Sequence, residues 1–250
     1  MKLENSFIVI PGFGEKTERK LWKNGVNHWD QIEETDHVTA GQRTKATEFI
    51  QKAKKNLEVN NTPFFNNQID SKYFWRLYNN FSENACFYDI ETTGLDKNRN
   101  KVTTVSFYRN GESKTLVRGD DLTAENLRQE IFESDIFVSF NGKRFDQPFL
   151  EHNFDVSFDK PHIDLMYACK RIGLSGGLKP IEKQVGIARE DVEDVNGREA
   201  VRLWKKYEKN GNEAALEKLV KYNQYDAENL KRLLEHVHTA LRKEIYEPHL

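Results

Sequence analysis

Several features that would decide the class of this chain at once are scarce or missing. Its 250 residues include only two cysteines, Cys86 and Cys169, which are too few for a disulfide framework and lack the spacing of metal ligands. No apolar run approaches the length of a membrane-spanning helix, and the short apolar run near the N-terminus has no signal-peptide cleavage site. These absences predict a soluble, cytoplasmic protein without a membrane partner.

The chain also lacks an excess of positive charge. Its 38 Lys and Arg residues face 40 Asp and Glu residues, so the formal net charge is −2 at pH 7. A broadly basic surface for nucleic acid is therefore excluded, and any phosphate-binding face has to be local or built with metal ions. Hydrophobic residues make up 37% and charged residues 31%, which is typical of a globular chain.

The first part of the chain has the pattern of short helices. Residues 16–23 and 40–57 place apolar side chains at helical spacing, which predicts two amphipathic helices within residues 1–60. Residues 61–82 are rich in asparagine and aromatic residues. We expect this segment to be a packed connector, because so many aromatic side chains would not be left in water.

From residue 85 the pattern changes to that of strands. A short apolar segment, an alternating segment ending in an Asn-Gly turn and its hairpin partner predict three antiparallel strands. A helix with a threonine cap and a further buried strand, which ends at Asn141, follow them. Everything after residue 162 has a helical pattern, and the longest helix is expected from about residue 212 to 244.

Acidic residues lie where these elements end. Asp89 and Glu91 are two apart on a strand, so their side chains point to the same side, and Asp146 follows the later buried strand. Tyr222 and Asp226 are four apart and share one face of the longest helix. Four converging carboxylates would repel one another unless divalent cations were bound. The pattern predicts an all-oxygen site for Mg²⁺ or Mn²⁺.

Three segments carry a resemblance to a known family. "DIETTGL", "FNGKRFDQPFL" and "YNQYDAENL" resemble, in order, the three exonuclease motifs of the DEDD superfamily, and the tyrosine four residues before the last aspartate matches the DEDDy branch. The spacing and the segment "HIDLMYACKRIGLSGGLKPIEKQVGI" are similar to stand-alone exonuclease domains of the YprB type. The resemblance implies an α/β fold, with an RNase H-like mixed sheet flanked by helices over residues 83–245 and a small all-α N-terminal region.

The resemblance also implies a role for each residue of the constellation. Asp89, Glu91, Asp146 and Asp226 would hold two divalent metal ions, which could activate a water and stabilise the leaving oxygen. Tyr222 would orient that water, since an unperturbed tyrosine titrates near ~10 and is a poor base. Taken singly, the acids could instead be solvated turn, capping or surface residues, and the tyrosine a core side chain.

Neighbouring residues are implied to contact the substrate. These are Thr92, Gly94, Leu95, Asn141 and Phe145. Phe145 could stack on a base or belong to the core. Asp164 would support the site or cap a helix. Six further basic residues could form a local basic face or a scattered solvated surface: Lys143, Arg144, Lys170, Arg171, Lys179 and Lys183.

The N-terminal segment "IVIPGFGEKTERKL" resembles a helix–hairpin–helix, a module that binds the nucleic-acid backbone. Backbone N–H groups near Gly12 and Gly14 would face a phosphate, and Lys16 would add charge. Glu18 departs from the motif, which usually has alanine there. A purely structural helical cap is the alternative for this region.

Together with these patterns, the resemblance implies a metal-dependent 3′–5′ exonuclease that releases nucleoside 5′-monophosphates from single-stranded nucleic acid, with DNA favoured over RNA. A monomer is favoured. A structure-specific endonuclease and a non-catalytic nucleic-acid-binding module on the same fold are the alternatives.

Overall fold

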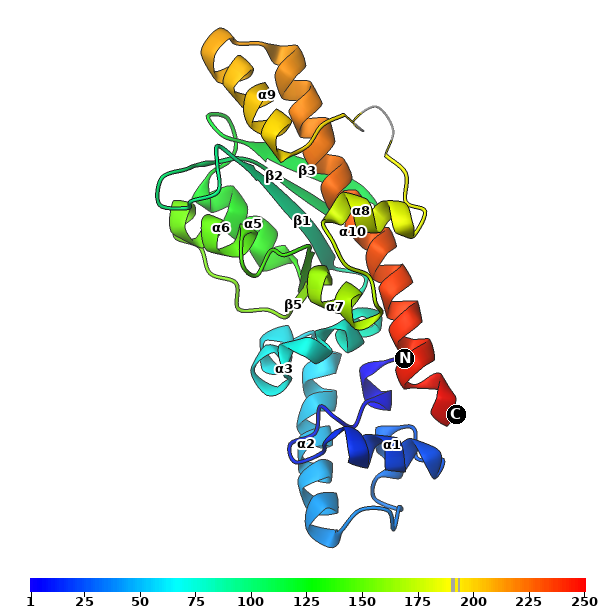
Figure 1. Ribbon diagram of the computed structural model, residues 1–250. Helices are drawn as coiled ribbons and strands as arrows, with labels where there is room; N and C mark the ends of the chain where they lie inside the picture. Colours follow the sequence, from blue (N-terminus) through cyan, green and yellow to red (C-terminus); the bar gives the residue numbers. More distant parts are fainter. Residues whose placement is uncertain (190–191, 193) are drawn as a thin grey trace.

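The computed structural model of the chain describes residues 1–189, 192 and 194–250. An open sheet lies at the middle of the molecule, and helices cover both of its faces (Figure 1). A helical N-terminal region lies at one end of the molecule. The longest helix runs along the sheet and continues to that region (Figure 1).

The sheet has five strands in the order β3-β2-β1-β4-β5. Its strands are β1 (Ala85–Thr92), β2 (Val102–Arg109), β3 (Glu112–Val117), β4 (Ile136–Ser139) and β5 (His162–Asp164). The first three pair as antiparallel neighbours, whereas β4 pairs parallel to both β1 and β5. The prediction of a mixed sheet flanked by helices is confirmed.

Strand β5 corrects one expectation. The prediction that everything after residue 162 is helical is wrong for Ile163 and Asp164, because they belong to β5, which pairs in parallel with β4. Three residues are too few to show a period of two, so this strand is defined by its neighbour rather than by its own sequence.

The helices of this part of the chain follow the predicted pattern. They are α5 (Ala124–Glu133), α6 (Asp146–Phe154), α7 (Leu165–Arg171), α8 (Leu178–Gln184), α9 (Gly197–Asn210) and α10 (Glu213–Ile245). The predicted cap of α5 is confirmed, because the Thr123 side chain accepts a hydrogen bond from the Asn126 N–H. Helix α10 begins and ends one residue after the predicted bounds. Among the described residues, no helix is both long and apolar enough to cross a membrane.

The N-terminal region is all-α, as predicted. Its elements are η1 (Leu3–Asn5), α1 (Glu15–Lys23), η2 (Trp29–Gln31), α2 (Ala40–Glu58), α3 (Thr62–Gln68), η3 (Ser71–Leu77) and α4 (Tyr78–Phe81), and a last turn, η4 (Glu247–His249), ends the chain. Most aromatic side chains of residues 61–82 are buried. One apolar core includes residues of this region, of β1 and of α10. The division into 1–60, 61–82 and 83–245 stays a prediction.

Candidate active site

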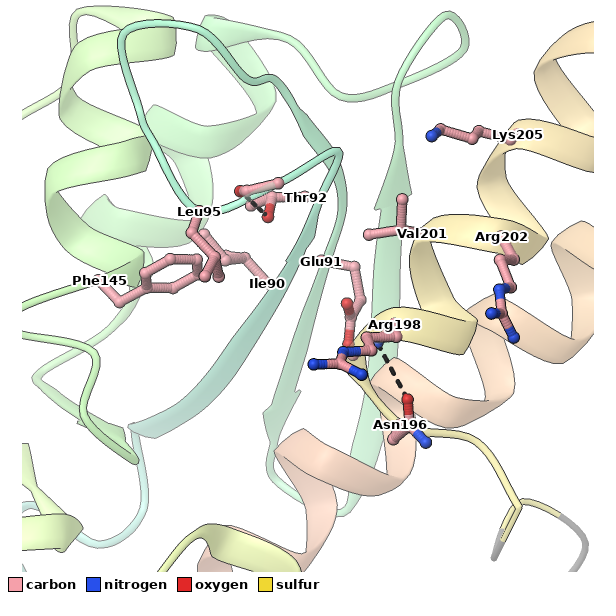
Figure 2. A pocket seen from close by; sticks show the side chains of 12 residues that line it. Ile90, Glu91, Thr92, Leu95, Phe145, Asn196, Arg198, Val201, Arg202 and Lys205 are labelled. Carbon is pink, nitrogen blue, oxygen red and sulfur yellow. Dashed lines mark hydrogen bonds between the residues drawn. The ribbon is translucent and has the colours of Figure 1, made fainter.

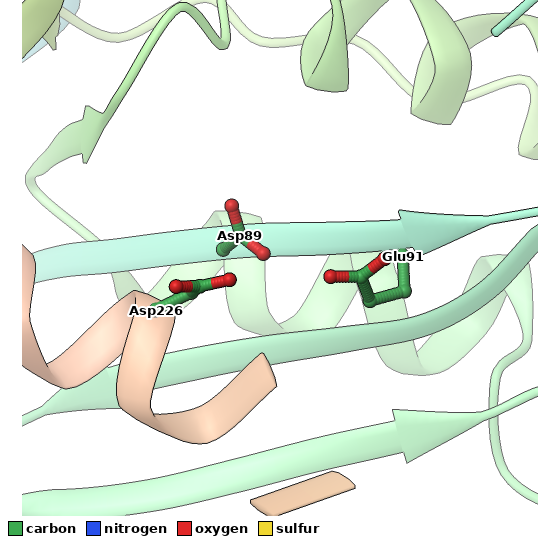
Figure 3. Close-up of side chains that lie close together, drawn as sticks. All are labelled: Asp89, Glu91 and Asp226. Atoms are coloured by element: carbon green, nitrogen blue, oxygen red, sulfur yellow. The ribbon is translucent and has the colours of Figure 1, made fainter. Parts of the chain in front are cut away.

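Three carboxylates form the centre of the site. Asp89 and Glu91 lie on β1, and Asp226 lies on α10, which packs against that strand (Figure 3). One carboxylate oxygen from each residue lies within 4.8 Å of the other two. The strand period places the first two acids on one side, and the crossing of α10 brings the third to them. The arrangement could hold a metal ion.

Asp146 lies next to β1, close to this group. It is the first residue of α6, it is buried, and its Oδ1 accepts a hydrogen bond from the Ile90 N–H at 3.2 Å. Its negative charge also raises the pKa of Asp89 and Glu91. Asp146 is not among the three described carboxylates that approach one another within 4.8 Å. Its role as a fourth metal ligand stays a prediction.

Ionisation of the acids in this site is unfavourable unless a cation is bound. Burial, followed by the neighbouring carboxylates, raises the pKa of Asp89 and of Glu91 well above the usual range. Burial also raises the pKa of Asp146, to about 7, and that of Asp226. A divalent cation would favour the ionised forms, and an all-carboxylate donor set suits a hard ion such as Mg²⁺ or Mn²⁺. The residues present therefore fit the predicted metal.

A buried arginine was missed in the sequence. The Arg189 guanidinium forms an ion pair with Asp226, and it donates two hydrogen bonds to the Glu182 carboxylate at 2.6 and 2.8 Å. This charge lowers the pKa of Asp226, but burial has the larger effect and the pKa stays raised. One guanidinium shared with Glu182 cannot balance the other carboxylates of the site. No short motif marks Arg189, because it lies in a loop and its partners belong to two separate helices, α8 and α10.

Tyr222 lies one turn before Asp226 on α10 and is buried. Burial, followed by the charges of Asp226 and Glu91, raises the pKa of its hydroxyl above the usual range. The hydroxyl therefore stays protonated and can donate a hydrogen bond, but it cannot act as a base. This state agrees with the predicted role of orienting a water, which remains a prediction.

Asn223 is a further residue that sequence reasoning missed. It is fully buried, and its Nδ2 donates to Asp89 Oδ2 at 2.7 Å while its Oδ1 accepts from Thr104 Oγ1 at 2.8 Å. The side chain thus fixes the Asp89 carboxylate against β2. Its position three residues before Asp226, on the same face of the helix, was the available signal.

A cavity of about 840 Å³ opens beside Glu91 (Figure 2). Four of the five predicted substrate contacts line it, namely Thr92, Gly94, Leu95 and Phe145. A Cβ at Gly94 would lie 2.5 Å from Asn100 Oδ1, so a larger residue there would displace the Asn100 side chain. The far side of the cavity belongs to α9, which the sequence analysis did not connect with the site.

Asn141 does not line this cavity. It has a left-handed φ of 63° and donates its backbone N–H to Asp164 Oδ1 at 2.8 Å. The Asp164 carboxylate also accepts from the backbone N–H groups of Lys143 and Met166, and the latter bond caps α7. Asp164 therefore has both roles expected of it: it supports the loop before Asp146 and it caps a helix.

The six basic residues considered for a local face do not line the cavity either. Lys143 Nζ lies 4.9 Å from the centre of the Phe74 ring, and Arg171 donates to the Lys72 carbonyl. Lys179 is close to the site, with its Nζ 4.8 Å from the centre of the Tyr222 ring. The cations of the cavity come from α9 instead.

The N-terminal glycine turn has one α-helix beside it. Gly12 has a left-handed φ of 85°, and Gly14 precedes α1, in which Lys16 is the second residue. Before Gly12, the described residues contain turns and the 3₁₀ helix η1 instead of an α-helix. Glu18 is buried and accepts hydrogen bonds from the Phe7 and Ile8 N–H groups, which an alanine could not do.

Comparisons with known proteins agree with this architecture. The model of the RNase_H superfamily matches residues 86–238. Similar solved structures include the apo form of a nuclease, with 20% identity over 67% of this chain and 78% of that chain and a TM-score of 0.50.

Two structures of NrnC from Brucella melitensis are also similar. The Mg²⁺-bound form has 20% identity over 69% of this chain and 81% of that chain, with a TM-score of 0.47. The form bound to pGG has 20% identity over 67% and 78%, with a TM-score of 0.46. At these identities the likeness concerns the fold alone. No curated protein matches the chain.

Proposed function

The chain belongs to the RNase H superfamily, and from the chemistry of its site we propose that it is a metal-dependent 3′–5′ exonuclease. Its substrate is single-stranded nucleic acid, with DNA favoured over RNA, and its products are nucleoside 5′-monophosphates. The observation that carries this proposal is the group of Asp89, Glu91 and Asp226, each of which has a carboxylate oxygen within 4.8 Å of the other two. The 3′–5′ direction depends on the resemblance to the DEDDy motifs.

In the proposed mechanism each side chain has a separate task. Asp89, Glu91 and Asp226, with Asp146 beside them, would hold two Mg²⁺ or Mn²⁺ ions, which when bound would supply activation of a water and stabilisation of the leaving oxygen. The protonated Tyr222 hydroxyl orients the water with its hydrogen bond. Thr92 and Gly94 line the cavity that receives the terminal nucleotide.

The test is digestion of a 5′-end-labelled single strand with Mg²⁺ or Mn²⁺. The wild type should shorten the strand stepwise from its 3′ end, whereas Asp89→Asn and Asp226→Asn should not. Asp120→Asn, which changes an exposed acid outside the site, is the matched control. Wild-type rates in both site variants would refute the proposal.

A circular single strand separates the proposal from its endonuclease alternative. An exonuclease needs an end, so the circle should persist while a linear strand of the same sequence is degraded. Nicking of the circle at a comparable rate would favour the endonuclease. Binding of both strands without cleavage would favour the non-catalytic module.

The N-terminal region is a second part of the proposal. We propose that Gly12, Gly14 and Lys16 contact the nucleic-acid backbone, because Lys16 lies with Arg19, Lys20 and Lys23 around a surface pocket. Lys16→Gln should weaken binding of a long strand without changing the rate on a dinucleotide. Unchanged binding would leave this region a purely structural cap.

A further inference from the structure

The cavity beside Glu91 has two unlike walls. One wall is apolar and consists of Ile90, Leu95 and Phe145, and Leu95 is 85% exposed although it is a large hydrophobic residue. The other wall is the part of α9 from Gly197 to Lys205 (Figure 2). Glu91, one of the clustered acids, lies between them (Figure 2).

The α9 wall is basic. Arg198, Arg202 and Lys205 all line the cavity, and their spacing of four and three residues places them on one face of the helix. They extend over about 10 Å of helix, at 1.5 Å per residue. The opposite face of α9, with Leu203 and Trp204, is buried in a small apolar cluster. That packing fixes the basic face toward the cavity.

These cations are available for a ligand. Within residues 1–189, 192 and 194–250, neither Arg198 nor Lys205 forms an ion pair, and both side chains are exposed. Arg202 pairs with Glu199 at 3.2 Å, but this contact lies at the surface and contributes little. Because the chain as a whole is slightly acidic, a row of three cations facing one cavity is a local exception.

We propose that α9 binds the phosphodiester backbone of the strand that leads into the site, opposite the wall of Leu95 and Phe145 that the resemblance already implies for the terminal nucleotide. This inference rests on the proposed nuclease function and adds the surface that holds the substrate. A single strand presents unpaired base faces along with its phosphates, and it therefore matches two such walls. The phosphates on α9 are those beyond the bond being cleaved, because that bond has to lie at the carboxylates.

Substrate length follows from this placement. A dinucleotide has one phosphodiester bond, which occupies the carboxylate site and leaves no internucleotide phosphate for α9. A longer strand adds phosphates that reach Arg198 and Lys205. The basic face should therefore contribute more to binding of long strands than to binding of dinucleotides.

The first experiment measures binding without cleavage. Arg198→Gln/Lys205→Gln is compared with Lys206→Gln/Arg232→Gln, which also removes one exposed Arg and one exposed Lys but lies outside the cavity. Both are made on an Asp89→Asn/Asp226→Asn background in EDTA. The probe is a fluorescent DNA strand of about 12 nucleotides, a length within the range that single-strand-binding domains cover. Anisotropy is recorded over a range of salt concentrations.

The two double variants should differ in salt dependence. Loss of two phosphate contacts should reduce the slope of log K against log[salt] by about 1.4, since each contact contributes about 0.7 on a single strand. The control variant should keep the slope of the background protein. Equal slopes, or no binding of the background protein at low salt, would overturn the inference.

The second experiment uses the active protein with Mg²⁺ or Mn²⁺. Arg198→Gln/Lys205→Gln should raise KM for the long strand by a larger factor than KM for a dinucleotide. An equal loss on both substrates would overturn the role of α9. If the wild type cleaves neither substrate, the nuclease proposal itself fails, whereas the binding slopes still decide whether α9 holds a strand.

Discussion

Two clusters of charged residues inside this molecule differ in whether their charges are balanced. In the N-terminal region, Glu18 Oε1 accepts hydrogen bonds from the Ser6 hydroxyl, from the Phe7 and Ile8 N–H groups and from Arg76 Nη1. The Glu18 and Arg76 side chains are both almost completely buried and form an ion pair of 2.7 Å. This cluster obtains its donors and its counter-charge from the chain itself.

The cluster around Asp89 is not balanced in this way. Its carboxylates repel one another, their pKa values are raised, and Arg189 is shared between Asp226 and Glu182. A buried acid with its own donors strengthens a fold, whereas several buried acids without enough counter-charge indicate a site for an external cation. The difference separates a structural carboxylate from a functional one, although both are buried.

The largest expected effect concerns stability in the N-terminal cluster. Glu18→Ala leaves the buried Arg76 charge without its ion-pair partner and two backbone N–H groups without their acceptor, so the free energy of unfolding should fall by about 3–5 kcal/mol. Denaturant unfolding measures this. Glu48→Ala, an exposed acid of α2, should change it by about 0.5 kcal/mol or less. A Glu18 variant as stable as the control would remove the contrast between the clusters.

Asp89→Asn should have the opposite effect, because it should reduce activity without reducing stability. Nuclease activity should fall by more than about 100-fold, which is the upper range for residues that only support a metal ligand. The free energy of unfolding without metal should not fall, because the change removes a charge that its neighbours repel. Cleavage rates and denaturant curves are measured on the same preparations. A destabilised Asp89 variant with residual activity would contradict this prediction.

Mg²⁺ should stabilise the protein through the cluster around Asp89 and not through the cluster around Glu18. At a Mg²⁺ concentration of 100 times Kd, the free energy of unfolding of the wild type should rise by about 2.7 kcal/mol. Glu18→Ala should keep this increase, and Asp89→Asn/Asp226→Asn should lose it. Thermal unfolding with and without Mg²⁺ measures the difference, and an increase in all three proteins would show that the ion binds elsewhere.

Asn223→Ala should reduce activity by about 10–100-fold, because Asn223 fixes the orientation of the Asp89 carboxylate. The reduction should be accompanied by weaker Mg²⁺ affinity, which a titration of activity measures. In the Asp89→Asn background the same change should have little further effect. Additive losses would mean that Asn223 acts independently of Asp89.

The smallest effect is a pH dependence. The pKa of Asp146 is raised to about 7, so between about pH 4 and pH 7 the folded protein binds more protons than the unfolded chain. This group therefore makes the metal-free protein less stable as pH rises through that window. Asp146→Asn should gain stability relative to the wild type from pH 4 to pH 7 in EDTA. The exposed control Asp36→Asn should show no such trend.

The sequence by itself determined the local geometry of the acids. A period of two places Asp89 and Glu91 on one side of β1, and a spacing of four places Tyr222 and Asp226 on one face of α10. The resemblance that the three motifs carry implied the mixed sheet and its helices. The pairing of the acids depends on residues close together in the chain, and for this reason periodicity could predict it.

Only the tertiary structure decided which groups surround these acids. Asn223 reaches Asp89 across 134 residues of chain, and Arg189 joins Asp226 to a different helix. The basic face of α9 turns toward Glu91 because its apolar face packs in a separate cluster. Such contacts follow from how α9 and α10 pack on the sheet, and no local pattern in the sequence encodes that packing.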